Sequence, residues 1–334
     1  MGQITLFDCT LRDGANAVPN GFSRKQAELI LEGLLSNGID TIEIGGSKGL
    51  GGVAPDESLN DQEYLEMAQP FTRRGTIGIF LNIKNATTER IREASDAGMK
   101  FIRIGAAAGD GFKCYEAIQQ VKACGIACEY SLMKSYLLPP ADLAREARVL
   151  ESCGLDRITV MDSAGTMLPE DVRAYVEAIR QEVRISVAFH GHNNLGLSHA
   201  NALTALEAGA DTLDCCLLGL ARSAGNGATE ILSALLARRG MLKTVNIPGL
   251  LGFVERQLLP ELGGCDESSF IRPEDVICGI AGCHSSFLSL FREMAVSHDV
   301  PLYDLIERVS VLDRKSPSRE LMEAEALALV EGRA

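Results

Sequence analysis

The segment Ile185-Ser186-Val187-Ala188-Phe189-His190-Gly191-His192 has the pattern of a buried strand that ends in two histidines. Alternate side chains of a strand share a face, so we expect the two imidazoles to lie side by side at the carboxyl end of this strand. Such a pair can supply two neighbouring metal ligands, or it can be two polar side chains that happen to alternate. The segments around it decide between these interpretations.

This strand belongs to a series of eight apolar runs that alternate with helical patterns. The strand-like runs are residues 4–12, 41–45, 76–82, 101–106, 127–133, 157–162, 186–192 and 212–218. Helical spacing appears in residues 23–37, 86–97, 115–124, 141–153, 198–208 and 230–239, and in a helix that begins near Pro169. This alternation predicts an α/β fold, a closed parallel (β/α)8 TIM barrel. An open doubly wound sheet usually has a glycine-rich phosphate turn after its first strand, which Thr10-Leu11-Arg12-Asp13-Gly14 lacks.

The pattern changes after residue 241, where helices no longer alternate with strands. Four helical segments are predicted at residues 250–259, 281–298, 301–311 and 320–331. We therefore expect two parts in the chain. Residues 1–241 would form a metal-dependent catalytic barrel, and residues 242–334 a helical C-terminal region that contributes to the active site, to partner contacts, or to both.

The composition indicates a globular protein with a large core. The 334 residues are 46% hydrophobic and 23% charged, with a net charge of −13. This charge argues against nucleic acid or an anionic membrane as a partner, and no apolar run has the length of a membrane span. Because a strand-like run follows the first three residues directly, we expect no signal peptide. The ten cysteines contain no CxxC pair, so we expect reduced thiols in a cytoplasmic protein.

Polar residues follow several of the predicted strands, and in a TIM barrel the carboxyl ends of the strands form the active site. Asp13 follows the first strand, His190 and His192 end the seventh, and Asn226 lies in the loop after the eighth. One carboxylate, two imidazoles and an amide oxygen make a mixed nitrogen and oxygen site without thiolates. Such a site suits Mn²⁺ or Mg²⁺, with Zn²⁺ or Fe²⁺ as alternatives.

Two further residues at the strand ends are candidates for substrate binding. Arg12 is a fixed positive charge that can hold an enolate or carboxylate oxygen, or it can form a salt bridge to Asp13 or Glu43. Ser163, after the sixth strand, can position substrate or hydrogen-bond across the barrel mouth.

These residues carry a resemblance to a known superfamily. Thr10-Leu11-Arg12-Asp13-Gly14, His190-Gly191-His192-Asn193-Asn194 and Gly225-Asn226 resemble the signature of the DRE-TIM metallolyases. Within that superfamily the chain is most similar to the 4-hydroxy-2-oxovalerate aldolases, through Val160-Met161-Asp162-Ser163-Ala164-Gly165 and Ile280-Ala281-Gly282-Cys283-His284-Ser285-Ser286-Phe287-Leu288. The resemblance covers nearly the whole chain.

The resemblance implies a division of roles. Asp13, His190 and His192 would bind a divalent metal, Mn²⁺ first among the candidates, with Asn226 as a further ligand or a neighbouring group. The metal would chelate a 2-oxoacid, and Arg12 would stabilise the pyruvate enolate. It also implies a possible second protein, because the related aldolases form complexes with an aldehyde dehydrogenase; a homo-oligomer is the alternative.

The chain departs from the aldolases where a proton is transferred. They have a catalytic histidine three residues after the metal aspartate, and here that position is Asn16, which cannot act as a base. We expect Asn16 to bind substrate instead. They also have a tyrosine in the C-terminal segment where this chain has His284, and a histidine after the second strand that is missing here. His284 is therefore our candidate for the catalytic proton transfer.

Three functions remain open from the sequence. The first is an aldolase that cleaves or forms a 4-hydroxy-2-oxoacid with altered proton-transfer residues. The second is a Claisen-type synthase or lyase that acts on an acyl-CoA and a 2-oxoacid. The third is a barrel without catalysis that serves as a binding or scaffold subunit. The similarity in the C-terminal region favours the aldolase, and the retained metal residues argue against a scaffold.

Overall fold

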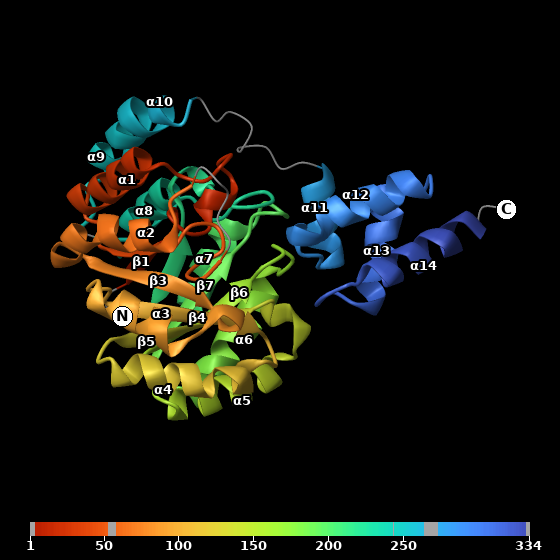
Figure 1. Ribbon diagram of the computed structural model, residues 1–334, viewed down its shortest axis with the longest axis horizontal. Helices are drawn as coiled ribbons and strands as arrows, with labels where there is room; N and C mark the ends of the chain where they lie inside the picture. The colour runs from red at the N-terminus through yellow and green to blue at the C-terminus, as the bar shows by residue number, and fades with distance from the viewer. Residues whose placement is uncertain (1–3, 53–57, 243, 264–272, 332–334) are drawn as a thin grey trace.

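A closed parallel barrel of eight strands forms the centre of the molecule, as the alternation predicts (Figure 1). The computed structural model describes residues 4–52, 58–242, 244–263 and 273–331. Each strand pairs with its sequence neighbours, and β8 closes the barrel on β1. The strands are β1 (Thr5–Asp8), β2 (Thr41–Ile44), β3 (Thr76–Asn82), β4 (Phe101–Ala107), β5 (Ala127–Met133), β6 (Arg157–Asp162), β7 (Ser186–Gly191) and β8 (Thr212–Cys215).

A helix follows each strand and covers the outside of the barrel. The helices are α1 (Arg24–Ser36), α2 (Asp61–Ala68), α3 (Thr88–Asp96), α4 (Tyr115–Ala123), α5 (Pro140–Ser152), α6 (Pro169–Glu182), α7 (Ser198–Glu207) and α8 (Thr229–Arg238). The start of α1 shows why the sequence folds this way. Ser23 and Gln26 form a reciprocal capping box, and the apolar face behind them is buried. The short helix α2, which opens with a capping box of Asn60 and Glu63, was not expected from the apolar spacing.

The first and the last strand end three or more residues before their predicted ends. The first ends at Asp8 rather than at residue 12, because the carbonyl of Cys9 accepts hydrogen bonds from the backbone N–H groups of Arg12, Asp13 and Gly14. The chain therefore turns at the mouth of the barrel, and the turn presents Arg12 and Asp13 there. The last strand ends at Cys215 rather than at residue 218.

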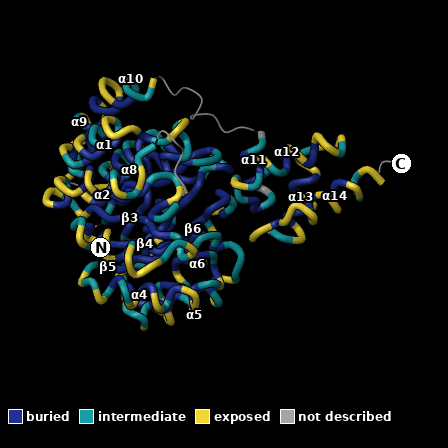
Figure 2. Tube along the Cα trace, in the orientation of Figure 1, coloured by how far each residue is buried: buried dark blue, intermediate teal, exposed yellow. Residues whose placement is uncertain are grey.

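The region after α8 packs in two places. The helices α9 (Ile247–Phe253) and α10 (Leu259–Glu261), joined by a π-helical turn (Val254–Leu258), lie beside α1, and Leu250 and Phe253 join the core of the barrel. The helices α11 (Pro273–Ala281), α12 (Leu288–Ser297), α13 (Leu302–Leu312) and α14 (Arg319–Glu331) surround a separate apolar core (Figure 2). The domain boundary expected after residue 241 stays a prediction.

One predicted helix is wrong. The segment 281–298 is not continuous, because α11 ends at Ala281 and Gly282 adopts a left-handed φ of 65°. A 3₁₀ turn, Ser285–Phe287, then precedes α12. This break places His284 in a loop rather than in a helix.

The four-helix region α11–α14 lies against the carboxyl ends of the strands. Asn194, after β7, donates to the carbonyl of Asp275, and Ser223, after β8, donates to the Asp275 carboxylate at 2.8 Å. The ammonium of Lys134, after β5, donates to the carbonyl of Lys315. These contacts hold the region over the barrel mouth. No helix in the described ranges is both long and apolar enough to cross a membrane.

Candidate active site

A network of buried charges crosses the interior of the barrel, and its centre is Arg103 on β4. This fully buried side chain donates to both carboxylate oxygens of Glu43 on β2, at 2.6 and 2.7 Å, and to Oδ2 of Asp214 on β8 at 2.6 Å. Because β4 and β8 lie opposite each other in the closed barrel, these bonds must span its interior. The guanidinium also lies 4.3 Å from the centre of the Phe7 ring.

The network orients two side chains at the barrel mouth. Glu43 accepts a second hydrogen bond, from Nε of Arg12 at 2.6 Å, and Asp214 lies 2.9 Å from Nδ1 of His190. Burial opposes ionisation of Asp214, but Arg103 and His190 outweigh it and lower the pKa of this carboxyl to about 2. The buried network therefore holds Arg12 and His190 in place at the barrel mouth through hydrogen bonds to its two carboxylates.

The three metal ligands expected from the sequence come together above this support. The Nε2 atoms of His190 and His192 lie 3.4 and 3.6 Å from Oδ2 of Asp13. All three side chains are buried. Two ligands about 2.1 Å from one ion stand roughly 3.0 to 3.5 Å apart, so this spacing suits a shared divalent cation.

The hydrogen bonds of the two histidines also fit a cation. Nδ1 of His190 faces Asp214, as the second nitrogen of a metal-bound histidine usually faces a carboxylate. Its Nε2 is buried without a hydrogen-bond partner in the described chain. Burial alone would lower the pKa of His190, but the carboxylates of Asp13 and Asp214 outweigh burial and raise this pKa. The surroundings of the ring therefore favour a positive charge. Burial lowers the pKa of His192 to about 3, which keeps that imidazole neutral and able to bind metal.

A second group of candidate ligands, Cys9, His190 and Asp214, shares His190 with the first. It is a poorer cation site, because Arg103 already donates to Sγ of Cys9 at 3.2 Å and to Asp214. Burial also raises the pKa of the Cys9 thiol, which opposes the thiolate that a metal requires. We therefore assign the candidate metal centre to Asp13, His190 and His192.

Two asparagines contact Asp13 from either side. Asn226 donates from Nδ2 to Oδ2 of Asp13 at 2.9 Å, and its own Oδ1 is buried without a hydrogen-bond partner among the described residues. A half-turn of this amide would present an oxygen to a cation. Asn16 donates to the carbonyl of Asp13 at 3.0 Å and to its Oδ1 at 3.3 Å. In this structure both amides orient Asp13.

The guanidinium of Arg12 is fixed by several contacts, and one of its N–H donor groups remains without a partner within the described ranges. Besides Glu43, it contacts Oδ1 of Asp13 at 3.1 Å, and its guanidinium carbon lies 5.0 Å from the centre of the Phe80 ring. One terminal nitrogen, Nη2, is buried and has no hydrogen-bond partner in the described part of the chain. This nitrogen is a free donor beside the candidate metal centre. Arg12 thus forms the salt bridges that the sequence allowed and also lines a cavity, and its catalytic role stays a prediction.

A cavity of about 400 Å³ opens above these residues. Ser163 and His284 line it, whereas Asn16 and Asn226 do not. Oγ of Ser163 accepts a hydrogen bond from the backbone N–H of Lys134 at 2.9 Å. The cavity is lined by Arg12, Asp13, Ser47, Lys48, Phe80, Asn82, Lys84, Met133, Lys134, Met161, Ser163, His190, His192, Arg222, His284, Ser286, Phe287, Lys315 and Ser316.

His284 reaches the cavity from the four-helix region. Its Nδ1 accepts a hydrogen bond from the backbone N–H of Ser286 at 3.2 Å and lies 2.7 Å from the hydroxyl of that residue. These contacts assign the ring proton to Nε2, which is the nitrogen left for a substrate. Burial, together with Arg222 and Lys134, holds the pKa of His284 well below its usual range. His284 is therefore a neutral imidazole at pH 7.

The chain is similar to known proteins both in sequence and in fold. The sequence profile of the HMGL-like family matches residues 3–253. The chain belongs to the HMGL-like family. It is 36% identical over 291 residues to a 4-hydroxy-2-oxovalerate aldolase of Roseiflexus sp., covering 86% of this chain and 85% of that one. It is 33% identical over 307 residues to the enzyme of the same name from Carboxydothermus hydrogenoformans, covering 91% and 90%.

Solved structures with lower sequence identity show the fold of the family. The HMG-CoA lyase of Bacillus subtilis superposes with a TM-score of 0.62 at 18% identity, over 78% of this chain and 94% of that one. The carboxyl transferase domain of Rhizobium etli pyruvate carboxylase superposes with a TM-score of 0.77 at 16% identity. That match covers 100% of this chain and 61% of the other. The HMGL-like barrel and the helices after it are thus both present in solved proteins.

Sequence reasoning missed four residues of this HMGL-like site. Arg103 and Asp214 are charged side chains in the middle of buried strands, and that position was the available signal. Arg222 lies in the loop that leads to Asn226, with one guanidinium nitrogen 3.7 Å from Oδ1 of Asp13. Lys134 follows β5 directly and has a left-handed φ of 57°, which no local pattern indicates.

Removing the centre of the charge network should destabilise the fold strongly. Arg103→Met leaves Glu43 and Asp214 buried without their main partner, which costs about 3 to 5 kcal/mol in the free energy of unfolding. Denaturant unfolding at pH 7 measures this loss. The exposed pair of Arg74 with Glu32 offers a matched control, and Arg74→Met should change the free energy of unfolding far less than Arg103→Met does.

The same variant has a signature in its pH dependence. The folded pKa of Asp214, about 2, lies below its ordinary value of 3.8, so its ionised form adds stability above pH 3.8 that is lost as the pH falls toward 2. In Arg103→Met the guanidinium that lowers the pKa of Asp214 is missing, so this pH-dependent stabilisation is lost. The difference in unfolding free energy between wild type and variant should therefore shrink as the pH is lowered through this window. A constant difference would contradict the assigned role.

Proposed function

We propose that this protein is a divalent-metal-dependent carbon–carbon lyase, an aldolase that cleaves or forms a 4-hydroxy-2-oxoacid through the enolate of pyruvate. The observation that carries the proposal is the position of Arg12, with a free donor, beside the cluster of Asp13, His190 and His192 at the cavity floor. The names of the HMGL-like relatives support it.

The candidate metal centre accounts for binding of the substrate head. Asp13, His190 and His192 would hold the cation, with Asn226 as a further ligand or as the group that orients Asp13. When bound, the cation would supply Lewis-acid polarisation of the 2-oxoacid. Because the ligands are oxygen and nitrogen without thiolate, we expect Mn²⁺, with Mg²⁺, Zn²⁺ and Fe²⁺ as alternatives.

Arg12 stabilises the charge that develops during the reaction. In cleavage, the hydroxyl at C4 loses its proton, the C3–C4 bond breaks, and its electron pair moves onto the 2-oxo oxygen to give the enolate and an aldehyde. The unpartnered nitrogen of Arg12 can donate to that oxygen. Because Glu43, Asp13 and Phe80 already fix the guanidinium, no reorganisation is needed as the charge appears.

His284 is the group we assign to proton transfer at the C4 oxygen. In cleavage Nε2 acts as the base in the other tautomer, with the ring proton on Nδ1 toward the hydroxyl of Ser286, and it takes the proton of the C4 hydroxyl to give an imidazolium. In aldol addition this imidazolium returns the proton to the C4 oxygen and becomes neutral again. Asn16, which occupies the place of the histidine in the related aldolases, has no titratable proton and holds Asp13.

The wider setting of the enzyme follows from the same proposal. We expect a small 2-oxoacid as substrate, in the cytoplasm. We also expect a second protein, either an aldehyde dehydrogenase that takes the aldehyde or further copies of this chain.

The metal ligands are tested by two substitutions. Asp13→Asn and His192→Ala each remove a ligand, and we expect loss of bound Mn²⁺ after dialysis together with loss of metal-dependent exchange of pyruvate C3 protons into D₂O. His298→Ala, a histidine in α12's C-terminal cap, serves as the matched control and should keep both. Exchange at an equal rate after chelation of the metal would sink the proposal.

Arg12→Lys tests stabilisation of the enolate. The lysine keeps the charge but loses the planar fork that bonds Glu43 and the substrate together. We expect kcat to fall by about 10²-fold or more, as when one oxyanion donor is removed. Bound Mn²⁺ should remain, which separates this effect from loss of the metal centre. An unchanged kcat would leave Arg12 with a structural role only.

His284→Ala should lower turnover by about 10²- to 10⁴-fold, the usual contribution of general acid–base catalysis. A base is active only when deprotonated, so activity falls as the pH drops through its pKa. Because the pKa of His284 is depressed, the acid limb of kcat/KM should lie below pH 6.5 and should vanish in the variant. If rate and profile stay unchanged, the base lies elsewhere. Asn16→His would then test whether the aldolase position restores cleavage of 4-hydroxy-2-oxovalerate.

A further inference from the structure

The cavity wall carries more positive charge than a 2-oxoacid head requires. Six lysines and arginines line the cavity, and among its described lining residues Asp13 is the one acid. The whole chain, by contrast, has a net charge of −13. A concentration of cations in an otherwise acidic protein indicates an anionic ligand. The cations are Arg12, Lys48, Lys84, Lys134, Arg222 and Lys315.

Several of these cations lack an acidic partner. Arg12 is paired with Glu43, and Nζ of Lys315 lies 3.0 Å from Oδ2 of Asp110. Across the described ranges, by contrast, no carboxylate lies within 4.0 Å of the ammonium groups of Lys84 or Lys134, and these two are left without an acidic partner.

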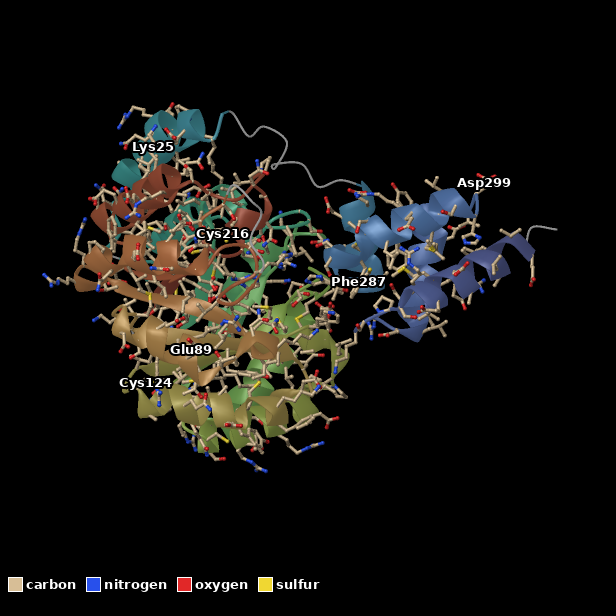
Figure 3. The ribbon with its side chains drawn as sticks, viewed as in Figure 1. Lys25, Glu89, Cys124, Cys216, Phe287 and Asp299 are labelled. Atoms are coloured by element: carbon tan, nitrogen blue, oxygen red, sulfur yellow. The ribbon has the colours of Figure 1, made fainter. Side chains whose placement is uncertain are left out.

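Lys134 is the most firmly placed of these side chains. Its left-handed backbone is held by the hydrogen bond to Oγ of Ser163. Its ammonium donates to the carbonyl of Lys315 and lies 5.1 Å from the centre of the Phe287 ring, which projects from the four-helix region toward the barrel (Figure 3). An ammonium has three donors, so further donors remain for a ligand. Burial lowers the pKa of Lys134, and although Cys283 and Asp313 oppose this shift, Lys315 and Lys84 add to it.

The lysines and the candidate metal centre lie on different sides of the mouth. Asp13 follows β1, and the two histidines end β7. Lys134 follows β5, which is opposite β1 in the closed barrel, and Lys84 follows β3. A substrate whose 2-oxoacid head lies at Asp13 therefore extends its other end toward Lys84 and Lys134.

We propose that the substrate carries a second anionic group, a carboxylate or a phosphate, at the end remote from its 2-oxoacid head, and that Lys84 and Lys134 bind this group. The aldehyde half of the aldol is then an anionic aldehyde. This inference rests on the proposed aldolase function. An uncharged end, such as the methyl group of 4-hydroxy-2-oxovalerate, would leave both ammonium groups without an anionic partner. Both lysines line the same cavity as the metal centre, which favours a small aldehyde over a coenzyme A thioester.

The test measures aldol addition of pyruvate, with Mn²⁺ present, to pairs of aldehydes that share a carbon chain and differ in whether its far end carries an anionic group. Succinic semialdehyde is set against butyraldehyde, and glycolaldehyde phosphate against glycolaldehyde. We expect kcat/KM to favour the anion by about tenfold or more in at least one pair, as for a charged hydrogen bond. The preferred pair identifies the group as carboxylate or phosphate. Added KCl should reduce the preference, because salt screens the attraction.

Variants assign the preference to the two lysines. Lys84→Met and Lys134→Met should each reduce the ratio of charged to neutral kcat/KM by about tenfold, whereas Lys134→Arg should retain most of it. Lys84 is exposed, so its variant tests the proposal even if Lys134→Met folds poorly. Lys100→Met, an exposed lysine just before β4 at the other end of the barrel, should leave the ratio unchanged.

The outcomes separate this inference from the function on which it rests. Equal kcat/KM for charged and neutral aldehydes, with metal-dependent exchange of pyruvate C3 protons intact, would overturn the anion site and leave the aldolase standing. Turnover of acetyl-CoA with pyruvate, and of none of the aldehydes, would overturn both. A charge preference that survives in both methionine variants would overturn the assignment to Lys84 and Lys134.

Discussion

The buried guanidinium of Arg103 is the interaction on which the site depends. Taking a charge out of water is costly, and the cost is offset only if every partner is present and well placed. Here Glu43 and Asp214 supply the opposing charge from two other strands. Glu43 also orients Arg12 through a hydrogen bond, and Asp214 orients His190 in the same way. The interior of the barrel thus fixes in one step the proposed enolate-binding donor, Arg12, and a candidate metal ligand, His190, although the first follows β1 and the second lies on β7.

This arrangement explains why the network is charged rather than apolar. Hydrophobic side chains would fill the barrel at lower cost in desolvation. They could not hold Arg12 against Phe80 with a free nitrogen, or hold the ring of His190 with one nitrogen on Asp214 and the other toward Asp13. Rigid placement of donors before the reaction begins is what electrostatic catalysis requires. The stability given up in the barrel interior is therefore tied to the chemistry at the mouth.

The sequence predicted the barrel and the clustered ligands because both depend on local pattern. Strand and helix periods are readable one element at a time, and His190 and His192 alternate within a single strand. Contacts across the barrel are not readable in this way. No residue near Arg103 in the sequence indicates that its side chain contacts Glu43 and Asp214. The pattern of residues 281–298 predicted a continuous helix, so the break at Gly282, which brings His284 to the cavity, was not predicted. The roles of the site residues remain predictions that the proposed variants test.

The cavity has walls from two separately packed cores. The barrel supplies the candidate metal ligands and Arg12, while the four-helix region, with its own apolar interior, supplies His284, Phe287 and Lys315. Substitutions in one core need not disturb the packing of the other. In evolution, such a division lets a lineage keep its enolate chemistry unchanged while the opposite wall drifts toward new aldehydes. His284 belongs to this opposite wall and stands where the resemblance to the aldolases implies a tyrosine, which is the kind of change that such a divergence would leave.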